Sequence, residues 1–284
     1  MLPPVDLRPP FNITRTSHVV LHVADLAKSR EFYVNVIGLV VSDEDDQTCY
    51  LRGLAEACHH SLVLVQTNGE ATCKRLGFRV FFEEDLDLAY QFFRSEGLPA
   101  EWVEVAHQGR TLHVSDPIGT KIELCATMET RERQYLNREI FKGAHAQRLD
   151  HVQIFAPDAY ALCEFYSRLG FRNSEYLAHG DKLLGAFMYR KGTCLIWRSS
   201  KTRGLVCITS PTPFRSRTTF LMHVTSQVST DTAPRSSAGP AATAQAECSL
   251  SICAIPMGTA LRSSTVTIKR LTSKSSRCVG MPAH

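Results

Sequence analysis

The 284-residue chain lacks any apolar run long enough to cross a bilayer, and it has no basic start followed by an apolar stretch. A membrane helix needs about 18 apolar residues in a row, and a secretory signal needs that basic and apolar start. We therefore expect a cytoplasmic protein with no membrane partner. Its ten cysteines include no Cys-x-x-Cys pair, so we expect reduced thiols rather than a zinc ribbon or a disulfide scaffold.

Acidic residues are almost missing from the last part of the chain. Residues 196–284 hold only Asp231 and Glu247 against 11 Lys and Arg, although the whole chain has 28 acidic residues. The segment is also rich in Ser and Thr and has little apolar periodicity, which is typical of disordered chains. Two interpretations compete. In the first, the segment is a solvated basic tail that binds phosphate groups only non-specifically and has no nucleic-acid partner. In the second, the segment is translated from a reading frame other than that of residues 1–195.

An internal repeat organises the rest of the chain. The segment 17–39 recurs at 150–171. The positions that are identical at an offset of 133 residues include His18 and His151, Val19 and Val152, Asp25 and Asp158, Phe32 and Phe165, and Tyr33 and Tyr166. Each copy starts with a β-rich run, passes an Asp suited to cap a helix, and ends in a Gly suited to stop it. The repeat predicts a strand, a helix and further strands in each copy.

A related unit follows the first copy. Residues 78–82 are typical of a strand and 85–94 of a helix that stops near Gly97, and Asp116-Pro117-Ile118-Gly119 has turn chemistry between two strands. The pattern predicts an α+β fold in which the N-terminal half holds two such modules. We expect an N-terminal domain at 11–127, a linker at 128–148 and the first module of a second domain at 149–195.

Several motifs together resemble one enzyme family. They are RLDHVQIFAPD at 148–158, HHSLVL at 59–64, HQGRTLHVSDP at 107–117 and the repeated helix that ends in Phe-Tyr. Over about residues 11–195 the chain is similar to the type I extradiol dioxygenases, of the catechol 2,3-dioxygenase kind, in the vicinal oxygen chelate superfamily. The resemblance implies paired βαβββ modules in open barrels. It also implies Fe(II) held by two His and one Glu in the C-terminal barrel, where His151 is the first ligand.

The resemblance implies a reaction that suits this ligand set. Two imidazoles and one carboxylate hold ferrous iron and leave three positions open, for two catecholate oxygens and O2. The expected function is extradiol (meta) cleavage of catechol or a substituted catechol to 2-hydroxymuconate semialdehyde, in aromatic compound degradation, by a homo-oligomer. The family's acid–base His and supporting Tyr would both fall after residue 195, where the reading frame is interpreted below as lost, so the catalytic residues are not assigned. The alternative is a non-catalytic ligand-binding or resistance protein on the same modules.

In the N-terminal half, His18 and Glu123 stand where two of the ligands would stand. The middle ligand position, aligned through RLGFRV, falls at Phe78. An aromatic carbon ring cannot bind iron. We therefore expect the N-terminal domain to be metal-free, with structural roles for His18 and Glu123.

Four other histidines in this half are not expected to form a metal site. His59 and His60 are adjacent, and in a strand they would point to opposite faces, which excludes joint chelation. His107 and His113 have no third ligand at a spacing that suggests convergence.

After Leu195 the family pattern stops, and a one-base change of frame recovers it. In the shifted frame Gly204–Ser210 can encode Gly-Pro-Arg-Leu-His-His-Phe, and Ala254–Ala260 can encode Arg-Asp-Pro-Asp-Gly-His-Arg. Near Leu261 the same frame accommodates Val-Glu. We interpret 196–284 as an out-of-frame tail that replaces the last module, with the slip between Gly192 and Ile196. The second His and the Glu ligand are then lost, and the chain as given is expected to be inactive.

Overall fold

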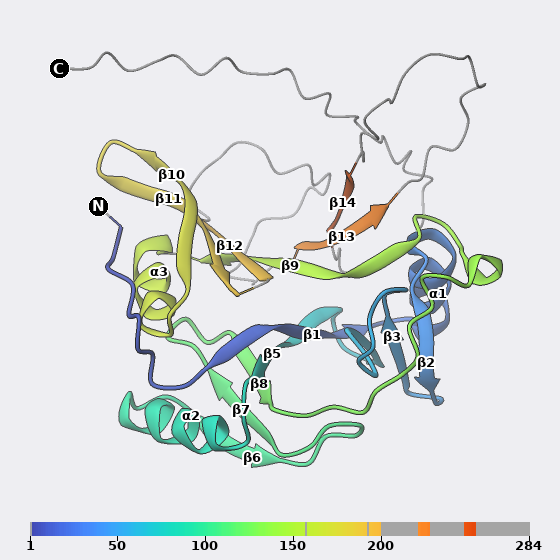
Figure 1. The fold of residues 1–284 in the computed structure, drawn as a ribbon, viewed down its shortest axis with the longest axis horizontal. Coiled ribbons are helices and arrows are strands. Elements are labelled where there is room, and N and C mark those ends of the chain that lie inside the picture. Colours follow the sequence, from blue (N-terminus) through green and yellow to red (C-terminus); the bar gives the residue numbers. More distant parts are fainter. Residues whose placement is uncertain (1, 157, 192, 200–220, 228–246, 254–284) are drawn as a thin grey trace, which may run out of the picture.

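The structure is a computed structural model that describes residues 2–156, 158–191, 193–199, 221–227 and 247–253. It contains two sheets, whose strands β1 (Ile13–Val23) and β9 (Ala146–Ala156) run across the middle of the molecule (Figure 1). No helix in these described ranges is long and apolar enough to span a membrane.

The first sheet is built from two βαβββ modules, as the repeat predicts. Its strands lie in the order β2-β3-β4-β1-β5-β8-β7-β6. After β1 the elements are α1 (Leu26–Glu31), a π-helical turn η1 (Phe32–Ile37), β2 (Val40–Glu44), β3 (Thr48–Arg52), β4 (Leu62–Gln66), β5 (Thr72–Val80), α2 (Glu84–Ser95), β6 (Ala100–Val103), β7 (Thr111–Ser115) and β8 (Lys121–Cys125).

The second sheet repeats the first module and extends it. Its order is β10-β11-β12-β9-β13-β14, in which the first four strands correspond to β2-β3-β4-β1. After a short 3-10 turn, η2 (Arg138–Ile140), and β9, the elements are α3 (Ala159–Arg168), β10 (Arg172–His179), β11 (Lys182–Arg190), β12 (Thr193–Ser199), β13 (Leu221–Gln227) and β14 (Glu247–Cys253).

The strand register confirms the repeat at the level of single residues. Val19 on β1 lies opposite Leu62, and Val152 on β9 lies opposite Leu195, so both partners keep the 133-residue offset. β13 then pairs antiparallel with β9, as β5 does with β1. The correspondence ends at the next strand, because β14 pairs antiparallel with β13 whereas β8 pairs parallel with β5.

The helix signals of the repeat are confirmed as well. The Asp25 carboxylate accepts a hydrogen bond from the Lys28 amide at 2.9 Å, and the Asp158 carboxylate accepts one from the Tyr160 amide at 2.8 Å. Each bond satisfies a free N–H of the first helical turn. Gly38 and Gly170 end the units with φ of +83° and +79°, a left-handed conformation that glycine adopts without a steric penalty.

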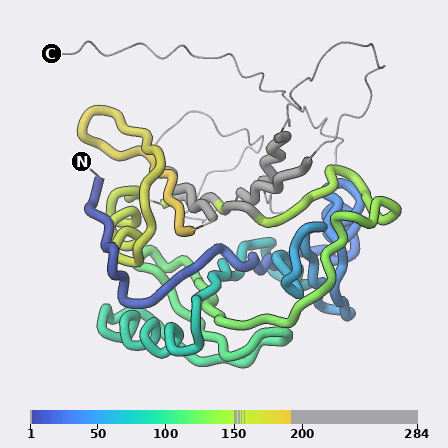
Figure 2. Tube along the Cα trace, in the orientation of Figure 1, coloured from blue at the N-terminus to red at the C-terminus, as the bar shows by residue number. Residues whose placement is uncertain are grey.

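The two halves share one hydrophobic core. In the chain trace of Figure 2 the N-terminal segment, in blue, runs beside the second half, and the Asp6 amide donates to the Ser167 carbonyl at 3.0 Å. Phe78 of β5 lies 5.9 Å, between ring centroids, from Phe171 of the second half. The Tyr166 hydroxyl on α3 donates to the buried Asp116 carboxylate at 3.3 Å. Burial of aromatic area and a bonded buried carboxylate both favour this packing, so the N-terminal modules and β9–β12 form a continuous structure.

Candidate functional site

The structure places His151 in the centre of the second sheet. Its backbone lies opposite Cys194 on β12 and opposite His223 on β13, and His223 lies opposite Ser251 on β14. His223 in the tail therefore lies beside His151 in the strand register. The sequence alone does not predict this pairing. Cys194, His151, His223 and Ser251 thus form a row across four neighbouring strands, and this row contains no carboxylate. Glu247 lies at the other end of the β13–β14 pair, opposite Gln227.

The corresponding row in the first sheet is His18, Gly77 and Glu123. The prediction that Phe78 fills the middle ligand position is wrong, because Phe78 lies opposite Leu124 instead. On β1, Phe78 lies opposite Thr16, and a register shift between Thr16 and His18 leaves Gly77 opposite His18. A Cβ atom at Gly77 would lie 2.3–2.6 Å from three atoms of the His18 ring, so the imidazole itself occupies the space where a middle ligand would stand.

Glu123, at one end of this row, is buried and its carboxylate is hydrogen-bonded. Its Oε1 lies 2.8 Å from His18 Nε2 and 2.7 Å from Gln108 Nε2, and its Oε2 lies 2.8 Å from His113 Nε2. Burial alone would raise the pKa of Glu123, but hydrogen bonds from His113 and His18 outweigh it and hold the pKa well below its usual range. Both carboxylate oxygens are thus occupied by protein donors, which is the arrangement that a structural role requires.

His59 and His60 do not point to opposite faces of a strand. They precede β4, outside regular strand alternation, and their Nδ1 atoms lie 3.1 Å apart, so one ring donates a hydrogen bond to the other. Both side chains are buried. Burial is the main reason that the pKa of His59 falls to about 4 and the pKa of His60 to about 2. Both rings are therefore neutral at pH 7.

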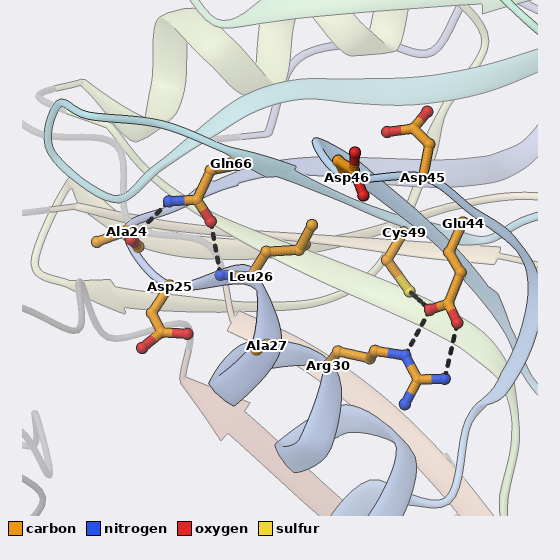
Figure 3. A pocket seen from close by; sticks show the side chains of 10 residues that line it. All are labelled: Ala24, Asp25, Leu26, Ala27, Arg30, Glu44, Asp45, Asp46, Cys49 and Gln66. Carbon is orange, nitrogen blue, oxygen red and sulfur yellow. Dashed lines mark hydrogen bonds and ion pairs between the residues drawn. The ribbon is translucent and has the colours of Figure 1, made fainter.

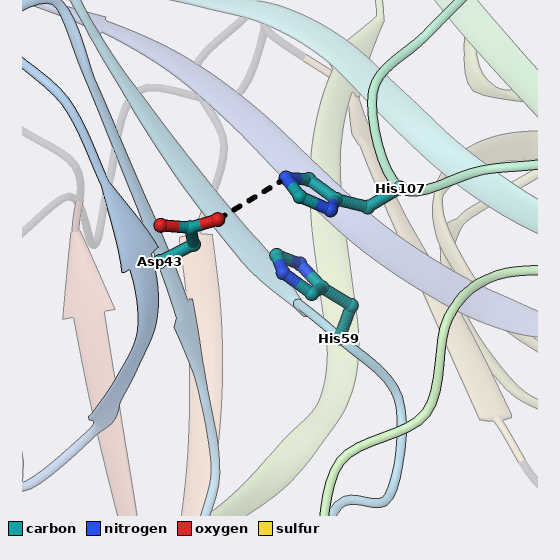
Figure 4. A group of neighbouring side chains, drawn as sticks. All are labelled: Asp43, His59 and His107. Carbon is teal, nitrogen blue, oxygen red and sulfur yellow. Dashed lines mark ion pairs between the residues drawn. The ribbon is translucent and has the colours of Figure 1, made fainter.

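His107 completes a cluster with His59 and Asp43, contrary to the prediction that it lacks convergent partners (Figure 4). Its ring stacks on His59 at a centroid distance of 3.7 Å and an angle of 9°. Its Nε2 lies 3.6 Å from Asp43 Oδ2, and its Nδ1 lies 3.1 Å from Glu129 Oε1. The expectation for His113 is also wrong, since that ring meets His18 at Glu123.

A surface pocket of about 470 Å³ lies elsewhere, between the start of α1 and the β2–β3 hairpin (Figure 3). Arg30 in this pocket is paired with Glu44. The other charged side chains that line it are acidic: Asp25, Asp45 and Asp46. Such a surface repels an anionic ligand such as a catecholate, so we do not assign it to substrate.

A second pocket, of about 400 Å³, is lined by Arg15, Arg133 and Arg148 beside the buried Glu56. Glu56 accepts hydrogen bonds from the backbone amides of Gly53 and Leu149. It therefore fixes the strand that carries His151 to the first domain.

Comparison with known proteins agrees with this fold. The profile of the Glyoxalase/Bleomycin resistance protein/Dioxygenase superfamily matches residues 15–124. The chain is 23% identical over 177 residues to a manganese-dependent 2,3-dihydroxybiphenyl 1,2-dioxygenase from Geobacillus genomosp. 3, covering 58% of this chain and 56% of that protein. It is 27% identical over 181 residues to a metapyrocatechase from Pseudomonas sp. (strain CF600), covering 60% of this chain and 59% of that protein.

Solved structures give the same result. An extradiol ring-cleaving dioxygenase from B. fuscum superposes with a TM-score of 0.65 at 33% identity, covering 69% of this chain and 56% of that one. The chain therefore spans less than two-thirds of the length of these relatives. Residues 15–124 belong to the Glyoxalase/Bleomycin resistance protein/Dioxygenase superfamily, and the chain's homologues in sequence and structure are extradiol dioxygenases.

Proposed function

We propose that the reading frame of residues 1–195 belongs to an enzyme that cleaves catechol-type rings beside the diol with O2, using Fe(II) on the second sheet. The position of His151 carries the proposal. It stands on β9 where His18 stands on β1, with the same register to the neighbouring strand. The similarity to metapyrocatechases and to an extradiol ring-cleaving dioxygenase supports the reaction class.

The donors beside His151 in this chain do not fit the iron site. Ferrous dioxygenase sites of this type use two imidazoles and a carboxylate. The row formed by Cys194, His151, His223 and Ser251 offers two histidines and no carboxylate. We therefore propose that the chain as given holds Fe(II) weakly and has no appreciable ring-cleaving activity, and we assign no catalytic step to its tail.

We attribute the missing carboxylate to a single-base change of frame. In the shifted frame 204–210 can encode paired histidines, and the codons near Leu261 can accommodate Val-Glu, in the order that follows His151. The restored protein is proposed to cleave catechol or a methyl- or chlorocatechol to a 2-hydroxymuconate semialdehyde, as a cytoplasmic homo-oligomer. In this proposal residues 11–127 form a counterpart of the iron domain that holds no iron at His18, 128–148 link the halves, and 149–195 begin the catalytic domain.

The test compares two full-length proteins, the chain as given and the frame-restored chain, each with Fe(II), catechol and air. The yellow semialdehyde is expected only from the restored protein. Turnover by the chain as given at ordinary enzyme rates would contradict the proposal, and so would a folded restored protein without activity.

The missing carboxylate also favours a second candidate for the chain as given, namely a non-catalytic ligand-binding protein on the same fold. Calorimetry separates the two. Binding of catechol to the chain as given with no consumption of O2 would support the binding protein, whereas the absence of binding would leave the tail without a function of its own.

A further inference from the structure

Three side chains of metal-ligand type meet outside the proposed iron site. One nitrogen or oxygen from each of Asp43, His59 and His107 lies within 4.8 Å of the other two (Figure 4). Asp43 is on β2, His59 precedes β4, and His107 lies between β6 and β7. Two imidazoles and one carboxylate suit Zn²⁺ and its first-row neighbours, whereas Mg²⁺ and Ca²⁺ prefer oxygen ligands alone.

The buried His59 gives an independent sign of a ligand. Its side chain is fully buried, its Nδ1 contacts His60, and its Nε2 has no hydrogen-bond partner among the described residues. A buried polar atom without a partner is uncommon in native proteins. Metal-binding histidines usually have the second ring nitrogen hydrogen-bonded. His60 provides this contact for His59, and Glu129 provides it for His107.

The cluster has to contract to hold an ion, because its ligand atoms lie within 4.8 Å of one another. Ligand atoms on a tetrahedral zinc lie roughly 3.4 Å apart, because each bond is near 2.1 Å. His107 Nε2 and Asp43 Oδ2 are 3.6 Å apart. The His107 ring has to tilt out of its stack on His59, and the exposed Asp43 side chain is free to follow it.

We propose that Asp43, His59 and His107 bind a divalent transition-metal ion of the zinc class, which joins the two edges of the first sheet. β2 and β6 are the two end strands of that sheet. The ion would link Asp43, on the edge strand β2, to His107, in the segment that follows the edge strand β6. This proposal departs from the expectation of a metal-free N-terminal half, in which His59 and His107 form no metal site. The cluster shares no side chain with the row of His18, Gly77 and Glu123.

The test uses the full chain, freed of metal with EDTA, and titrates it with Zn²⁺ in a calorimeter and in a thermal-unfolding assay. An ion that binds only the folded state raises Tm, by roughly 5 °C or more at a 100-fold excess over Kd. We expect one equivalent of Zn²⁺ to bind and Mg²⁺ to have no effect. A chain without a saturable zinc site would overturn the proposal.

Variants distinguish this cluster from other zinc-binding groups. His107→Ala and Asp43→Ala should each weaken zinc affinity at least tenfold and remove the Tm rise, and both change side chains that reach the surface, so the fold is retained. His179→Ala, an exposed histidine on β10, is the matched control and should bind as the parent does. His151→Ala should also bind normally, which separates this site from the proposed iron site. Zinc binding that survives His107→Ala, as it would if the cysteines held the ion, contradicts the proposal.

Discussion

Gly77→Ala tests the close contact between strands β1 and β5. The added Cβ would lie 2.3–2.6 Å from three atoms of the His18 ring, whereas ordinary contacts lie at 3.4–4 Å. The ring therefore has to move by about 1 Å, which breaks its 2.8 Å contact with Glu123. Overpacking costs about 1–3 kcal/mol, and loss of a hydrogen bond to a charged group costs about 1.5–3 kcal/mol. We expect the free energy of unfolding to fall by about 3–5 kcal/mol.

Urea unfolding followed by circular dichroism measures this loss, and Gly69→Ala is the control. The nearest atom to a Cβ at Gly69 is 3.5 Å away, so we expect its unfolding free energy to change by less than about 0.5 kcal/mol. The double variant His18→Ala with Gly77→Ala should lose less unfolding free energy than the two single variants lose together. The reason is that the added methyl group no longer contacts an imidazole ring. A Gly77→Ala protein as stable as the Gly69→Ala control would refute the argument.

Three further changes probe the buried acids and the contact between the halves. The pKa of Glu123 is lower in the folded chain than in the unfolded one, so its ionisation stabilises the fold above about pH 4.3 and this contribution is lost as pH falls. Glu123→Gln should therefore be less stable at pH 7 but lose less stability than the parent between about pH 6 and pH 3, measured by urea midpoints; equal pH slopes would contradict this. Tyr166→Phe removes the hydroxyl that donates to Asp116 and should cost about 1 kcal/mol in thermal unfolding, so an unchanged Tm would exclude a role for this bond. Arg168→Ala breaks a surface pair with Glu96 and should cost at most about 1 kcal/mol in low salt and less in high salt; a larger, salt-independent loss would show that Arg168 acts by packing.

The sequence predicted the local structure well because the signals are local. Asp25 and Asp158 cap helices, and Gly38 and Gly170 end them, since each residue acts on its own neighbours in the chain. The repeat also predicted that each copy forms a strand, a helix and further strands, because two copies of one sequence pattern have the same local signals.

The candidate sites were less predictable because they depend on register and on distant contacts. Gly77, and not Phe78, lies opposite His18 in the pairing of β1 with β5, and no sequence pattern marks this register. Asp43 and His107 come from the opposite edges of the sheet. Asp43 and His107 come close together because the sheet is curved. The adjacent pair His59 and His60 was the only sequence signal used here that pointed to this cluster.

The pairing of the tail was not predicted either. β13 and β14 come from a segment with little apolar periodicity, and they bring His223 opposite His151. The row beside His151 still has no carboxylate, which is consistent with the proposal that the last module is out of frame.

The most direct test of the account measures ring cleavage by the frame-restored protein, with one base added between codons 192 and 196, and by its His151→Ala and His18→Ala variants. The account predicts Fe(II)-dependent formation of the yellow semialdehyde by the restored protein, no activity after His151→Ala, and activity with reduced stability after His18→Ala. Full activity after His151→Ala, together with loss of activity in a folded His18→Ala protein, would place the iron in the other half of the molecule and contradict the account.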